Sequence, residues 1–194
     1  MCLQYKVEVF GTGNKKIELT LLNEPAEKKL GGMMSSELFA ENIAIVVEDN
    51  PQTVEYDFAC LAYKEDGTAP RVMMKSNIYK ELKKGTTESK VIVFHEIGHY
   101  FNGDMIVNTA DEDKEREELV ANNEVSIKEL KADAFAVQYL GAECVVQGLN
   151  DLKNRILNEY ADYDAESVKL SAKEIDIRIL LTEKNKDLWE HNYE

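Results

Sequence analysis

The chain has 194 residues, of which 44% are hydrophobic and 31% are charged, a composition typical of one globular domain with a substantial core. Its 23 basic and 37 acidic side chains give a formal net charge of −14 at neutral pH. A surface this negative repels phosphate groups and anionic lipids, so we expect no nucleic acid and no membrane among its partners.

Three features of the sequence predict a cytoplasmic protein. The longest apolar runs, such as "IAIVV" at residues 43–47, are too short to cross a bilayer. The first ten residues show no basic segment followed by an apolar stretch, so we expect no secretion signal. Cys2, Cys60 and Cys144 are odd in number and lack CxxC spacing, which favours reduced thiols over a disulfide framework.

The first half of the chain has the patterns of strands. Residues 3–10 and 16–22 alternate apolar and polar side chains around the turn "GTGNK", which predicts an antiparallel hairpin. Residues 25–42 are compatible with a helix that Gly31 and Gly32 would interrupt. Three further strands are expected, with a turn at 65–68 between the last two, over residues 43–47, 54–63 and 71–75.

From residue 76 onward the pattern becomes helical, and glycines such as Gly85, Gly103 and Gly141 follow the apolar periodic segments, where helices end. The expected helices cover residues 76–84, 89–102, 126–140, 142–160 and 171–190. Because the predicted strands precede the predicted helices along the chain, we expect an α+β fold with a mostly antiparallel sheet and a helical second half. We expect one domain over residues 1–194.

Residues 95–99 read His-Glu-Ile-Gly-His within an apolar predicted helix. Helical residues i and i+4 share a face, so the imidazoles of His95 and His99 can reach the same ion. Zinc accepts nitrogen ligands in a tetrahedral shell, and Glu96 would lie beside it, where a carboxylate can take a proton from a bound water. The competing interpretation is two histidines at the edge of the core that hydrogen-bond to the backbone without a metal.

A catalytic zinc site needs a third protein ligand. The spacing that would place a third histidine at position 105 is absent, because the chain has Met105, and Asp104 follows the expected end of the helix. Glu129 is the better candidate, since it shares a helix face with Asp133 in "ELKADAFA", whose alanines would allow close approach to the HExxH helix. Asp133 would then accept the free N–H of a ligand histidine and fix its tautomer.

The two motifs, HEIGH and ELKADAFAVQYLG, resemble those of the gluzincins, zinc peptidases with HExxH on one helix and ExxxD on the next. Residues 91–160 are similar to the HtpX and CAAX-prenyl-protease family. That family usually spans membranes and often has a His-Pro before a final arginine-containing helix, whereas residues 171–180 here keep an arginine without a His-Pro. The short gap between the motifs is also similar to the ImmA/IrrE group of soluble metallopeptidases, whose members cut or regulate transcriptional repressors.

The resemblance implies a zincin-like fold with Zn²⁺ as cofactor, zinc bound by His95, His99 and Glu129, Glu96 as general base, and Asp133 supporting a histidine. The predicted function is therefore a zinc metallopeptidase that hydrolyses peptide bonds of a peptide or protein substrate through a metal-bound water activated by Glu96.

Two alternatives remain open at the level of the sequence. One is a regulatory zinc-binding module that docks to a repressor or another protein partner, and the other is a structural metal site without turnover. The acidic segment 111–124, expected as a solvated loop or as an exposed helix beside the site, would be a docking surface in the first case. The strand at 71–75 is either a sheet edge that accepts a substrate as an added strand or an ordinary inner strand.

Overall fold

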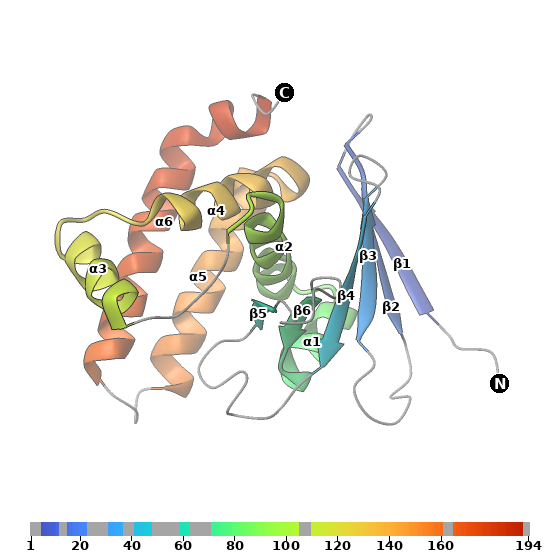
Figure 1. Ribbon diagram of the computed structural model, residues 1–194, viewed down its shortest axis with the longest axis horizontal. Coiled ribbons are helices and arrows are strands. Elements are labelled where there is room, and N and C mark those ends of the chain that lie inside the picture. The colour runs from blue at the N-terminus through green and yellow to red at the C-terminus, as the bar shows by residue number, and fades with distance from the viewer. Residues whose placement is uncertain are drawn as a thin grey trace.

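The computed structural model describes residues 5–11, 15–22, 31–36, 41–47, 59–62, 71–104, 110–160 and 165–191. Within these ranges a six-stranded sheet precedes the helices along the chain, so the predicted α+β class is confirmed (Figure 1). The strands are β1 (Tyr5–Phe10), β2 (Ile17–Leu22), β3 (Gly32–Ser36), β4 (Glu41–Val47), β5 (Ala59–Ala62) and β6 (Arg71–Met74). The helices are α1 (Ser76–Lys84), α2 (Thr87–Phe101), α3 (Ala110–Ala121), α4 (Ile127–Leu140), α5 (Ala142–Glu159) and α6 (Ala165–His191).

The sheet has the order β1-β2-β3-β4-β6-β5. The predicted hairpin is present, with Phe10 of β1 opposite Ile17 of β2, and every neighbouring pair is antiparallel except β4 with β6. Strand β6 pairs with β4 on one side and with β5 on the other. Of the two alternatives for residues 71–75, the inner strand is therefore confirmed and the sheet edge is wrong. The edge on that side is β5, the described part of the strand predicted at 54–63; the predicted turn at 65–68 lies outside the described residues.

The prediction of a helix over residues 25–42 is wrong where the structure describes this segment. Residues 32–36 form β3, and residues 41–47 form β4. The two glycines that would have interrupted a helix allow neighbouring strands to approach closely instead. A Cβ atom at Gly31 would lie 1.9 Å from the carbonyl oxygen of Ile45, and one at Gly32 would lie 2.3 Å from that of Thr20. Residues 25–30 and 37–40 of this segment lie outside the described residues.

Helix α2 lies between the sheet and the helical half of the molecule (Figure 1). The sheet buries one row of side chains toward the helices, including Ile17, Leu19, Leu21, Ile43 and Ile45. From α2 the fully buried Val93, Phe94 and Ile97 enter the same core. The apolar run "VIVF" therefore places the helix that carries the histidines in the middle of the fold, where apolar contacts on several sides fix its position.

The helices end largely where the sequence predicted. Gly85 and Gly103 follow α1 and α2 with φ angles of 82° and 71°, values that glycine adopts without strain. The acidic segment forms α3, an exposed helix that packs against α6 through an ion pair of 2.6 Å between Arg116 and Glu174. None of the described helices has an apolar stretch long enough to cross a membrane.

Candidate metal centre

Helix α2 is held against its neighbours at glycine contacts. A Cβ atom at Gly98 would lie 2.8 Å from the Cα atom of Ala132 in α4, so these two helices touch through their backbones. On another side of α2, a Cβ atom at Gly148 of α5 would lie 2.5 Å from a methyl carbon of Val91. Such close packing fixes the distance between α2 and α4, the two helices that carry the candidate ligands.

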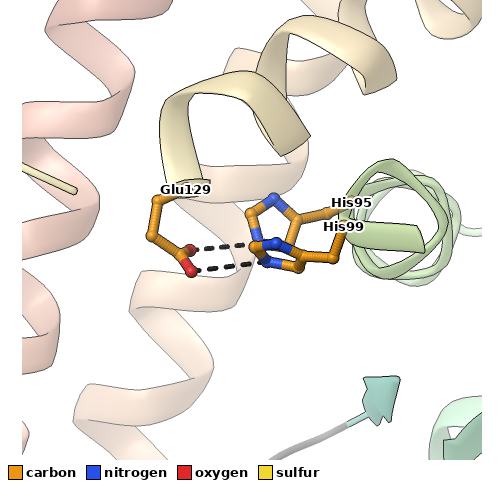
Figure 2. Close-up of side chains that lie close together, drawn as sticks. All are labelled: His95, His99 and Glu129. Atoms are coloured by element: carbon orange, nitrogen blue, oxygen red, sulfur yellow. Dashed lines mark hydrogen bonds and ion pairs between the residues drawn. The ribbon is translucent and has the colours of Figure 1, made fainter. Parts of the chain in front are cut away.

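The side chains of His95 and His99 leave the same face of α2 and meet Glu129 from the first turn of α4 (Figure 2). The two Nε2 atoms lie 3.1 Å apart. Glu129 Oε2 is 3.1 Å from His95 Nε2, and Oε1 is 3.3 Å from His99 Nε2. At the start of α4, the Ser126 side chain accepts a hydrogen bond from the Glu129 N–H, which fixes the turn that presents the carboxylate.

The donor set and its spacing fit a tetrahedral metal ion. Two ligand atoms that lie about 2.0–2.1 Å from a tetrahedral zinc ion are about 3.3–3.4 Å apart. The two Nε2 atoms are 3.1 Å apart, and each has a different oxygen of Glu129 at 3.1 or 3.3 Å, all close to this value. One ligand atom from each of the three residues lies within 4.8 Å of the other two. Two imidazole nitrogens and one carboxylate oxygen suit zinc, and also iron(II), so the group could hold a metal ion of either kind.

Asp133 lies behind His95, in the position that the sequence analysis assigned to it. Its side chain is fully buried, and Oδ1 lies 2.8 Å from His95 Nδ1. With the proton on Nδ1 donated to Asp133, the Nε2 lone pair of His95 points toward Glu129 and His99, which is the tautomer a metal ligand requires. Burial acts to raise the pKa of Asp133, but the charges of Arg178 and His95 hold this pKa below its ordinary value.

Asp104, the alternative third ligand, does not join the converging atoms. Its Oδ2 lies 3.2 Å from Nδ1 of His99, on the opposite side of the ring from Glu129. Gly103 turns the chain after α2 so that the Asp104 N–H donates to the His99 carbonyl, 2.9 Å away. Asp104 therefore gives His99 the support that Asp133 gives His95, a role that the sequence analysis missed.

Arg178 is the arginine that the sequence analysis noted within residues 171–180 without giving it a role at the site. It comes from α6, is 8% exposed, and donates to both carboxylate oxygens of Asp133, with Nε 2.8 Å from Oδ2 and Nη2 2.6 Å from Oδ1. Its Nη1 lies 3.3 Å from Glu129 Oε2. Nη2 is also 3.0 Å from His95 Nδ1. Both nitrogens carry protons that point at Asp133 Oδ1, so the two groups share this acceptor and do not bond each other.

The electrostatics of the group favour a cation. Burial and the Arg178 charge act to lower the pKa of His95, but Glu129 and Asp133 outweigh them and raise it to about 10. Burial likewise opposes the charge of Glu129, yet His95, His99 and Arg178 keep its pKa well below the ordinary value. With both imidazoles neutral, as metal ligands must be, the three carboxylates that contact them and the one guanidinium leave a formal charge of −2, which a single divalent cation would cancel.

Glu96, the expected general base, lies beside the histidines on α2 and is partly exposed. In a helix its side chain is rotated by about 100° from His95 and about 60° from His99. It therefore lies on the flank of the histidine pair, not on the far side of the helix.

Comparison of the chain with protein-family models, with curated proteins and with solved structures found no significant match. The resemblance to the gluzincins therefore stays a prediction. The assignment of the site depends on the positions and the chemistry of its own side chains.

Proposed function

We propose that the protein is a zinc-dependent peptidase that hydrolyses peptide bonds. The observation that carries the proposal is the convergence of His95 Nε2, His99 Nε2 and the Glu129 carboxylate from two separate helices, with Glu96 next to the first ligand. When bound, zinc supplies Lewis acidity, which activates water and polarises a carbonyl group.

The side chains of the site would transfer the protons and hold the ligands in position. Glu96 takes the proton from the attacking water on its carboxylate and passes it to the leaving amine nitrogen. The Nδ1–H groups of His95 and His99 donate hydrogen bonds to Asp133 and Asp104, so that both Nε2 atoms are available as ligands. Both rings are less than a tenth exposed, which strengthens these interactions by keeping bulk water away.

The substrate on this proposal is a peptide in extended conformation. Among the strands that the structure describes, β5 is the edge next to β6, and it contacts α2. An extended peptide can hydrogen-bond to such an edge as an added strand, which would carry its scissile bond past the histidines. This edge takes the place of the strand at 71–75, which the sequence analysis considered for the same purpose.

The test compares the wild-type chain with Glu96→Gln. The metal content of both purified proteins is measured by mass spectrometry, and both are incubated with a mixed peptide library whose products are sequenced. We expect equal zinc content and a loss of cleavage of about 100-fold or more in the variant, as for removal of a general base. Glu143→Gln, an exposed substitution of the same kind on α5, is the control and should cleave like wild type.

Two results would overturn the proposal in different ways. A wild-type chain that binds zinc and cleaves no peptide would favour the non-catalytic binding module. A wild-type chain that binds no transition metal would mean that the histidines and Glu129 form a hydrogen-bonded cluster only.

A further inference from the structure

The two acidic side chains on α4 repel each other. Glu129 and Asp133 are four residues apart on one helix face, and like charges at this spacing repel. Burial increases the repulsion, because Asp133 is fully buried and Glu129 is only 28% exposed. Without a compensating group, the Glu129 side chain would turn toward water and away from the histidines.

The guanidinium of Arg178 contacts both carboxylates at once. Two of its nitrogens bond the two oxygens of Asp133, and the third lies 3.3 Å from Glu129 Oε2, the same oxygen that lies 3.1 Å from His95 Nε2. Each nitrogen of the planar group is therefore directed at one of the two acidic side chains. A lysine ammonium is a single point charge and cannot reproduce this arrangement.

Helix α6 holds Arg178 from a fixed position. The buried Ile175 and Thr182 lie on the same helix, one turn before and one turn after it. Glu174, a further buried residue of α6, bonds Arg116 of α3, and Asp176 bonds Lys153 of α5 at 2.6 Å. The guanidinium is thus presented by a helix that neighbouring helices hold on several sides.

We propose that Arg178 is a positioning residue of the metal centre, which holds the Glu129 carboxylate in the geometry that binds the ion and keeps Asp133 on His95. The proposal rests on the metal site assigned above, but not on peptidase activity. Substitutions of residues that support metal ligands typically weaken metal affinity by about 10–100-fold. We expect Arg178→Lys to fall in this range, although it keeps the positive charge.

The experiment titrates the metal-free protein with Co²⁺ and with Zn²⁺, using a chromophoric chelator as competitor. The visible absorption of bound Co²⁺ reports the geometry of its ligands, which a general loss of stability does not change. The control is Arg155→Lys. Arg155 makes a matched two-point contact with Glu88, at 2.6 and 2.8 Å, between α5 and α2, and neither residue is a candidate ligand. We expect Arg155→Lys to keep the wild-type affinity within about threefold and the wild-type Co²⁺ spectrum.

The outcomes separate this proposal from the proposed function. Equal affinity and an equal Co²⁺ spectrum in Arg178→Lys and wild type would overturn the positioning role and leave the peptidase proposal standing. A wild-type chain that binds neither ion would overturn both. Weaker binding with an altered spectrum in Arg178→Lys, but not in Arg155→Lys, would support the positioning role.

A second variant covers the case in which Arg178→Lys does not fold, as judged by circular dichroism. Arg178→Met combined with Asp133→Asn removes both partners of the buried pair, so no buried charge is left unpaired at position 133. The amide oxygen can still accept from His95 Nδ1, while Glu129 loses its guanidinium contact. Affinity at least about tenfold weaker is expected, and wild-type affinity would overturn the proposal.

Discussion

Gly98 of α2 and Ala132 of α4 lie in backbone contact, so close that a Cβ atom at position 98 would be 2.8 Å from the Ala132 Cα atom and 2.9 Å from its carbonyl oxygen. Backbone atoms cannot rotate away as the end of a side chain can. The ligands are divided between these two helices, and the separation of the helices is therefore part of the geometry of the metal site.

Gly98→Ala should consequently weaken metal binding as well as stability. We expect a loss of about 1–3 kcal/mol in the free energy of unfolding, as for overpacking in a core, and metal affinity at least about tenfold weaker. Urea denaturation of the metal-free protein and competitive Zn²⁺ titration measure the two effects.

Gly148→Ala is the control for this substitution. It introduces a contact of 2.5 Å with Val91 between α2 and α5, and α5 provides none of the ligands. It should lower stability while metal affinity stays within about threefold. Equal metal affinity in both variants would show that the contact of Gly98 with Ala132 does not set the ligand geometry.

Glu129→Gln tests whether α4 provides a ligand. The amide keeps the shape of the side chain but loses its charge. Loss of a residue that supports a ligand typically weakens affinity by about 10–100-fold, and we expect Glu129→Gln to weaken Zn²⁺ affinity by more than this. The measurement is Zn²⁺ titration against a chelator, with the exposed Glu124→Gln as the control that should behave like wild type. An unchanged affinity would leave a site of two histidines only.

The elements that could be predicted from the sequence are those that local patterns determine. The strands over 5–10 and 17–22 alternate with period two, and Gly85 and Gly103 end helices through their own backbone angles. Residues 32–36 were misassigned because the glycines at 31 and 32 meet backbone atoms of strands elsewhere in the chain. The inner position of β6 likewise depends on its pairing with β5, which no local pattern shows.

At the candidate site, too, the sequence predicted which residues share one helix face, but not the contact that α6 makes there. The spacing of four residues placed His95 with His99 and Glu129 with Asp133, because a helix brings such residues to one face. Arg178 is 45 residues from Asp133 in the sequence, and only the packing of α6 against α4 brings the two together. For Asp104, the sequence indicated closeness to His99 but not which ring nitrogen it would face.

Asp104→Asn should weaken metal binding with little loss of stability. The side chain of Asp104 is 12% exposed, and the amide oxygen can still accept from His99 Nδ1, so we expect about tenfold weaker Zn²⁺ affinity and a nearly unchanged unfolding midpoint. Asp133→Asn should lower the midpoint much more, because it leaves the buried Arg178 charge without its carboxylate. Thermal denaturation of both metal-free variants measures the difference. Equal loss of stability in the two would contradict the assignment of Asp133 and Arg178 as a buried ion pair.

Removal of the metal should make the stability of the protein more dependent on pH. In the metal-free chain the pKa of His95 is raised from 6.5 to about 10 by Glu129 and Asp133, against burial and Arg178. A raised pKa contributes stability that is complete below the unfolded value of 6.5 and is lost as pH rises through about 10. A metal ion requires neutral His95, so its binding displaces that proton and becomes stronger over the same interval.

The difference in melting temperature between zinc-loaded and chelator-treated protein should therefore grow from pH 6.5 to pH 9. Differential scanning calorimetry at fixed free Zn²⁺ measures it, and His95→Gln, which has no titrating ring, should abolish the pH dependence of the difference. Because Glu129 and Asp133 stay ionised over this interval, their charges contribute no slope of their own. A difference that shrinks as pH rises would mean that the proton on His95 does not compete with the metal, and that the ion is held at another place in the chain.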